Sequence, residues 1–112
     1  MDEQTMRRND VLCLAITTYG ADNQIDKAIE EMAELTKALL KLRHAKPKHK
    51  SPMEPAYREF WENVVEEIAD VQIMMAQMEI IFGEIEVACE AGKKLARLEK
   101  RIAEVRTNEA TD

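Results

Sequence analysis

Glycine, proline and aromatic residues are scarce in this chain of 112 residues, which has three glycines, three prolines and 4% aromatic side chains. β-Sandwiches and β-barrels need many turn residues and β-forming side chains, so the composition argues against both. No apolar run approaches the ~18 residues of a membrane span, and the first residues do not resemble a signal peptide. The composition therefore predicts a soluble, cytoplasmic, all-α protein.

Cysteine is also rare, and Cys13 and Cys89 lie far apart in the sequence. Neither a zinc site nor a disulfide framework is indicated, because there is no Cys-x-x-Cys pair. Cys13 stands in an apolar segment at 11–14, so we expect it in the core. No serine, cysteine or histidine is arranged as a nucleophile.

Positive charge is outweighed, since 16 basic residues stand against 22 acidic ones and give a net charge of −6. Nucleic acids and anionic membranes are bound largely through positive charge, so neither is an expected partner. Between Leu35 and Met53, however, lysines gather and no carboxylate occurs. We predict a basic loop over 46–54, which is either a solvated linker or a patch that attracts a small polyanion.

The hydrophobic pattern predicts four helices with apolar residues at spacings of three and four. Their expected ranges are 5–19, 23–45, 55–82 and 84–106. Gly20 is the expected end of the first helix, and Asp22 or Asn23 is the expected cap of the second. Pro55 suits the first turn of the third helix.

Short connections between these helices favour an antiparallel four-helix bundle in a single domain, 1–112, with 107–112 as a flexible tail. The apolar arc of the second helix covers close to half of its circumference. A helix in a monomeric bundle needs only about three positions in seven. Surplus apolar surface of this kind usually marks an interface, and two-fold dimers are the commonest assembly. We therefore expect a homodimer, with a tetramer as the alternative.

Two of the predicted helices each carry a pair of carboxylates three residues apart, Glu31 with Glu34 and Glu67 with Asp70. Like charges at this spacing repel by roughly 0.2–0.5 kcal/mol per pair. Glu67 also falls within the apolar arc of its helix, where an unpaired carboxylate is costly to bury. A divalent cation would remove both costs, and all-oxygen ligation suits Mg²⁺ or Mn²⁺. One such pair is common on solvated helices, whereas two pairs on neighbouring helices are a more specific sign of a metal site.

These pairs stand in the segments EEMAEL at 30–35 and EEIADV at 66–71, which resemble the MazG-like nucleoside triphosphate pyrophosphohydrolases over about 20–90. The resemblance implies a bundle of the all-α NTP pyrophosphatase type and Mg²⁺-dependent cleavage of a (deoxy)nucleoside triphosphate to the monophosphate and pyrophosphate. A house-cleaning role would fit such an enzyme, and Mn²⁺ would substitute for Mg²⁺. The resemblance also implies four metal ligands with a catalytic role: Glu31, Glu34, Glu67 and Asp70.

Phosphate oxygens that the metal does not hold need hydrogen-bond donors, and a nucleoside base needs a stacking surface. Basic residues in the last helix resemble the family's basic C-terminal segment, while the remaining candidates lie close to the carboxylate pairs. Each of the cations could instead be a solvated surface residue, and the tryptophan could belong to the core. The candidate substrate contacts are Lys27, Trp61, Asn63, Lys93, Lys94 and Arg97.

Two other functions stay open at this point. The chain could be a phosphoribosyl-ATP pyrophosphohydrolase-like enzyme within the same superfamily. It could also be a non-enzymatic helical interaction module, in which the acidic pairs form a partner-binding face.

Overall fold

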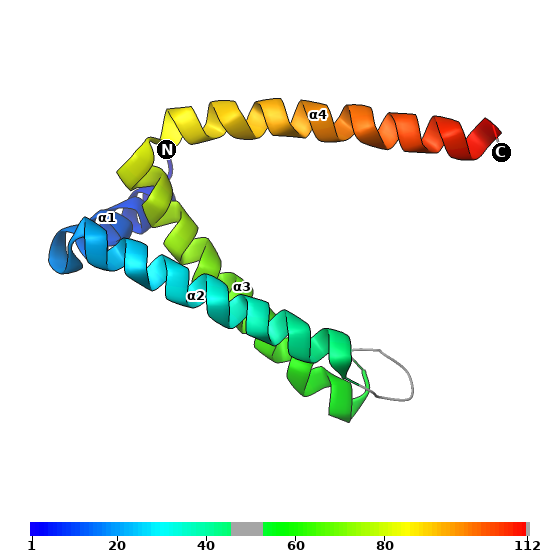
Figure 1. Cartoon of the computed structure of the whole chain (residues 1–112). Coiled ribbons are helices and arrows are strands. Elements are labelled where there is room, and N and C mark those ends of the chain that lie inside the picture. Colours follow the sequence, from blue (N-terminus) through cyan, green and yellow to red (C-terminus); the bar gives the residue numbers. More distant parts are fainter. Residues whose placement is uncertain (46–52, 112) are drawn as a thin grey trace. The chain divides into compact units, whose positions relative to one another are not determined.

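The computed structural model describes residues 1–45 and 53–111, and within them it contains four helices and no strands (Figure 1). The predicted all-α class is confirmed, while the four-helix bundle of the pyrophosphatase type stays a prediction. Only Met53 and Glu54 of the predicted basic loop lie among the described residues. The helices are α1 (Glu3–Tyr19), α2 (Ala21–His44), α3 (Pro55–Phe82) and α4 (Glu84–Thr111).

α1 ends at Gly20, as predicted, and the backbone there has a φ of 92° and a ψ of 147°. The same glycine is the N-cap of α2, which has no side-chain cap. The prediction that Asp22 or Asn23 caps α2 was wrong, because Gly20 alone separates the two helices and both side chains fall inside the first turn of α2. The Asn23 side chain instead donates to the Tyr19 carbonyl at 2.7 Å.

Replacing Gly20 by alanine should destabilise the fold by about 1–3 kcal/mol, because this backbone conformation is essentially restricted to glycine. Gly92, inside α4, provides the matched control, since a Cβ there would meet no atom within 4 Å. Gly92→Ala should stabilise the helix by ~0.5–1 kcal/mol. Urea unfolding followed by circular dichroism measures both effects, and a Gly20→Ala variant as stable as the wild type would refute the first.

α4 continues to Thr111, although we expected the helix to end near 106. Thr107 remains in the helix, and its hydroxyl donates to the Ala103 carbonyl at 2.8 Å. The predicted end was therefore too early. The pattern of large apolar residues stops at Val105, but the polar residues that follow are compatible with continued helix.

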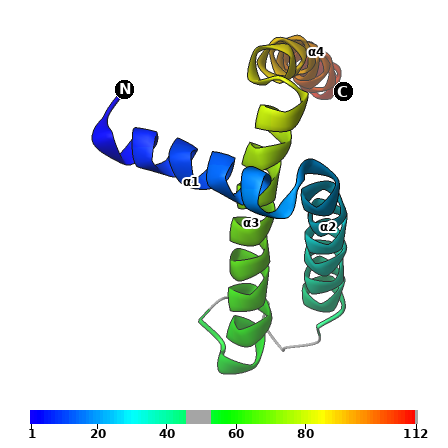
Figure 2. The same ribbon diagram turned by 90° about the vertical axis from the view of Figure 1, so that its left-hand side faces the viewer.

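The chain forms two compact units, Met1–Ile81 and Phe82–Asp112. In the first unit, α2 and α3 lie side by side and antiparallel (Figures 1 and 2). The core is small, and its apolar members in the described residues are Leu12, Ala28, Ala38, Ala45, Tyr57, Val64, Met74 and Ala76. No helix in the described ranges is both long and apolar enough to cross a lipid bilayer.

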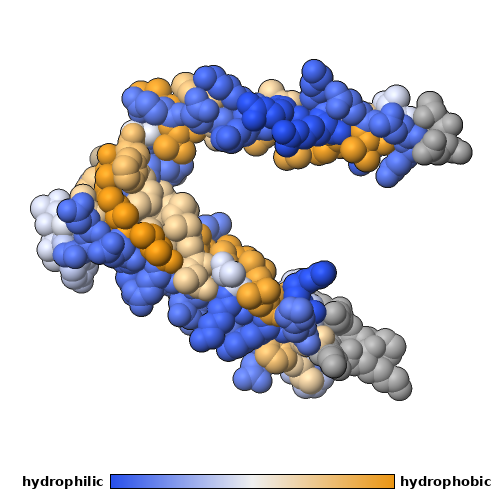
Figure 3. Space-filling view, viewed as in Figure 1, coloured by the Kyte–Doolittle hydropathy of each residue, from blue (hydrophilic) through white to orange (hydrophobic). Residues whose placement is uncertain are grey.

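Cys13 is exposed, so the prediction that it belongs to the core was wrong. Leu12 is the buried position of α1, and the following residue points about 100° around the helix, towards solvent. Other apolar side chains are also exposed, among them Val65 and Ile73 of α3, at 56% and 46%. Figure 3 shows such side chains gathered over α3. The expected surplus of apolar surface is present, and the homodimer stays a prediction.

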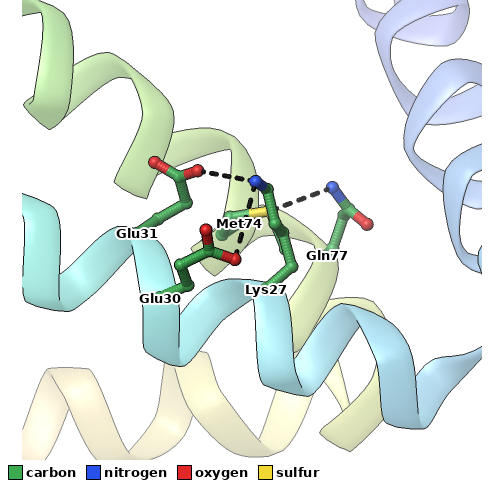
Figure 4. A network of polar contacts seen from close by, with 5 residues as sticks. All are labelled: Lys27, Glu30, Glu31, Met74 and Gln77. Atoms are coloured by element: carbon green, nitrogen blue, oxygen red, sulfur yellow. Dashed lines mark hydrogen bonds and ion pairs between the residues drawn. The ribbon is translucent and has the colours of Figure 1, made fainter.

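A buried amide pair joins α2 to α3. The Gln24 side chain donates from Nε2 to Oε1 of Gln77 at 2.7 Å, and both residues are buried. The Nε2 of Gln77 in turn donates to Sδ of Met74 at 3.7 Å (Figure 4). Because a buried amide without a partner costs ~1–3 kcal/mol, this pair favours one register between the two helices.

Candidate metal centre

The register set by the amide pair determines which carboxylates meet. Glu31 follows Gln24 by two helical turns, and Asp70 precedes Gln77 by two turns on the antiparallel helix. Glu67 lies one further turn along α3, on the same side. The structure thus brings one carboxylate of the α2 pair against both carboxylates of the α3 pair.

The three side chains, Glu31, Glu67 and Asp70, each offer one oxygen, and these oxygens all lie within 4.8 Å of one another. We call this group the acidic cluster. Glu31 and Glu67 are half-buried, and Asp70 is exposed. One side of the cluster is therefore shielded by the two helices, while the other is accessible to solvent.

Glu67 is the least satisfied member of the acidic cluster. Its Oε2 is buried and has no hydrogen-bond partner among the described residues. Burial raises the pKa of the Glu67 carboxyl above its ordinary value, and the negative charges of Asp70 and Glu31 raise it further. The prediction that Glu67 lies within the apolar arc of α3 is consistent with this burial. A buried carboxylate oxygen without a donor calls for a proton or a cation.

Lys27, a predicted phosphate contact, lies beside Glu30 and Glu31 on α2 (Figure 4). Its Nζ is 3.2 Å from Oε1 of Glu31 and 3.8 Å from Oε2 of Glu30. The hydrogen bond with Glu31 raises the pKa of Lys27, and the negative charge of Glu30 adds to the shift. Lys27 thus offsets part of the charge of Glu31, whereas no described residue gives the buried oxygen of Glu67 a hydrogen bond.

Glu34, the fourth predicted ligand, is exposed and lies outside the group of three oxygens within 4.8 Å. Its negative charge still contributes to the raised pKa of Glu67. The α2 pair therefore differs from the α3 pair, since only its first member joins the acidic cluster.

Two of the candidate substrate contacts, Trp61 and Asn63, lie on α3, N-terminal to Glu67 and Asp70. Trp61 is 42% exposed, and its ring centroid is 6.4 Å from that of the buried Tyr57. The alternative that Trp61 belongs to the core is therefore wrong. Asn63 is half-buried and lines an open pocket of about 450 Å³, which the sequence did not reveal. The pocket is lined by Lys41, Glu59, Phe60, Glu62, Asn63 and Glu66.

The remaining predicted phosphate contacts, Lys93, Lys94 and Arg97, are exposed residues of α4 in the second unit. Nζ of Lys93 is 3.3 Å from Oε1 of Glu90, one turn earlier on the same helix. This is an exposed pair of the kind that contributes little to stability.

The buried amide pair is the feature of the site that sequence reasoning missed. Gln77 follows Met74 and Met75 in the most apolar helix, and a long polar side chain in that position was a usable signal.

Comparison of the chain with protein-family models, with curated proteins and with solved structures found no match.

Proposed function

We propose that this chain is a Mg²⁺-dependent nucleotide pyrophosphohydrolase, which cleaves a (deoxy)nucleoside triphosphate to the monophosphate and pyrophosphate. The observation that carries the proposal is the buried Oε2 of Glu67, which has no hydrogen-bond partner in the described part of the chain and lies beside two further carboxylates. Three like charges within 4.8 Å destabilise one another unless a cation joins them. The type of reaction is inferred from the resemblance of the two carboxylate pairs to the MazG-like motifs.

The donor set fits a hard divalent cation. Glu31, Glu67 and Asp70 would hold Mg²⁺, which prefers carboxylate oxygens and retains sites for water and substrate phosphates. When bound, Mg²⁺ neutralises phosphate charge and activates water for attack on a phosphoryl group. Mn²⁺ has the same ligand preference and should substitute.

The protein's own part in such a reaction is chiefly to position the substrate and to balance its charge. Lys27 lies beside Glu31 and can donate to phosphate oxygens that approach the cluster. The exposed Trp61 ring offers a stacking surface for a base, and Asn63 offers an amide to the open pocket. Lys93, Lys94 and Arg97 remain proposed phosphate contacts. Cytoplasmic house-cleaning of unwanted nucleotides is the role that we propose.

Pyrophosphate release from a panel of nucleotides tests this function. We expect release from at least one nucleoside triphosphate with Mg²⁺ and none with EDTA. Glu79, an exposed carboxylate of α3, supplies the matched control, so Glu79→Gln should retain the activity. Release from phosphoribosyl-ATP alone would move the enzyme to the other substrate class. No release from any nucleotide with Mg²⁺ or Mn²⁺ would favour the non-enzymatic interaction module.

The lysines of the predicted basic loop, Lys46, Lys48 and Lys50, lie outside the described residues, and their role stays a prediction. A lysine cluster without a counter-charge attracts polyanions, and salt screens that attraction. Changing all three to serine should raise KM at low salt with little change in kcat. Steady-state kinetics at low and high ionic strength measure this, and an unchanged KM at low salt would leave the segment as a linker.

A further inference from the structure

α4 carries a stripe of apolar residues with alternating spacings of three and four. With Ala88 as position a of a seven-residue repeat, labelled a to g, every a and d position from 88 to 105 is apolar. All six side chains are exposed, and the four larger ones have exposed fractions between 46% and 68%. Figure 3 shows apolar side chains along one edge of the helix. The stripe consists of Ala88, Ala91, Leu95, Leu98, Ile102 and Val105.

This stripe has no partner within its own unit, since Phe82–Asp112 contains α4 as its single helix in the described residues. Helices in proteins gain most of their stability by packing an apolar face against another element. A strict repeat of a and d positions is the pattern of a seam between two supercoiled helices, which is narrower than the face of a globular helix. Leu98 at d and the β-branched Ile102 at a are the combination that favours two parallel strands, whereas Leu95 at a and Val105 at d do not follow it.

The charges beside the stripe favour a parallel pair of helices over an antiparallel pair. In a parallel, in-register coiled coil, position g of one helix faces the next e position of the other. Lys94 then faces Glu99 of the second helix, and symmetry makes this attraction occur twice. An antiparallel pair with the same apolar layers would place Lys94 against Arg101. In the parallel pair, Arg101 and Arg106 are like charges across the next heptad.

We propose that α4 pairs with α4 of a second copy of this chain as a parallel, two-stranded coiled coil. The proposal goes beyond the proposed function, and none of its tests measures turnover. It also assigns a specific interface to the expected homodimer.

Disulfide trapping tests the parallel register. Both native cysteines, Cys13 and Cys89, are exposed and are first replaced by serine. In that background Val105→Cys, at position d, should form a disulfide-linked dimer, because equivalent d residues meet across a parallel seam. Lys100→Cys, at the outward position f, is the matched control. We expect at least ten times more cross-linked product from Val105→Cys. Equal yields from the two variants would overturn the proposal.

Two charge changes provide the second test. Arg106→Glu replaces a repulsion with an attraction to Arg101 and should lower the dimer dissociation constant by roughly 2- to 10-fold. Glu99→Lys places like charges against Lys94 and should raise the constant by a similar factor. Sedimentation equilibrium of the full chain measures both. The pairing would be contradicted if the two dissociation constants changed in the opposite directions or did not change at all. A wild-type mass of one chain, 12.9 kDa, at ~100 µM would contradict it as well.

Discussion

Replacing Glu67 by glutamine is expected to lower Mg²⁺-dependent pyrophosphate release at least ~100-fold while leaving the helical circular dichroism unchanged. The substitution keeps the size of the side chain but removes the charge at the most deeply placed oxygen of the acidic cluster. Asp70→Asn should behave similarly. Because Asp70 is exposed, the Asp70→Asn substitution does not disturb the core, so a loss of activity in this variant would come from the site itself. Full activity in either variant would show that the assigned ligands are wrong.

The same variant should be more stable than the wild type in the absence of metal. Burial and neighbouring charges raise the pKa of Glu67 above its ordinary value of 4.5, so the folded protein holds this proton more tightly than the unfolded chain. The group therefore stabilises the fold at low pH, and this contribution is lost as the pH rises through the folded pKa. Glutamine does not ionise, so the Glu67→Gln variant does not lose stability in this way as the pH rises. Urea midpoints of the metal-free proteins, measured between pH 4 and 8, should diverge with rising pH in favour of the variant. A constant difference between the two midpoints over this pH range would show that ionisation of Glu67 does not destabilise the metal-free fold.

Replacing Gln77 by leucine is expected to lower the free energy of unfolding by about 1–3 kcal/mol, because Gln24 then remains buried without a partner. Native domains are stable by only ~5–15 kcal/mol, so the shift in the urea midpoint should be large. The double variant Gln24→Leu/Gln77→Leu removes both polar groups. It should recover most of the loss, because two apolar side chains of similar size can replace a buried hydrogen-bonded pair.

The amide pair also links stability to the site. Glu31 and Asp70 meet because Gln24 and Gln77 align α2 with α3 two turns away. A double variant that regains stability but permits other registers should therefore lose pyrophosphate release. Equal stability of the single and double variants would contradict the role of the pair in the core.

The helices were predictable because their apolar spacings and their terminal residues are local features of the sequence. α3 begins at Pro55 and ends at Phe82, as predicted, because a proline and a glycine mark its ends. Cys13 was misplaced because periodicity identifies a face of a helix and not how deeply that face is buried.

The candidate site was predictable in part for the same reason. The position of Glu67 within an apolar arc follows from one helix alone. Which member of the α2 pair would meet it depends on the register between two helices, and that register depends on the buried contact of Gln24 with Gln77. Glu31 and Glu34 were therefore both predicted as ligands, whereas the structure brings Glu31 into the acidic cluster and leaves Glu34 exposed outside it.

Titration of the protein with Mn²⁺, followed by electron paramagnetic resonance of the free ion, measures whether the acidic cluster binds a metal. We expect a Mn²⁺ site in the wild type that Mg²⁺ displaces. That site should be lost in Glu67→Gln and Asp70→Asn and kept in Glu79→Gln. Equal Mn²⁺ binding by Glu67→Gln and the wild type, or no binding by the wild type, would contradict a metal centre at the acidic cluster.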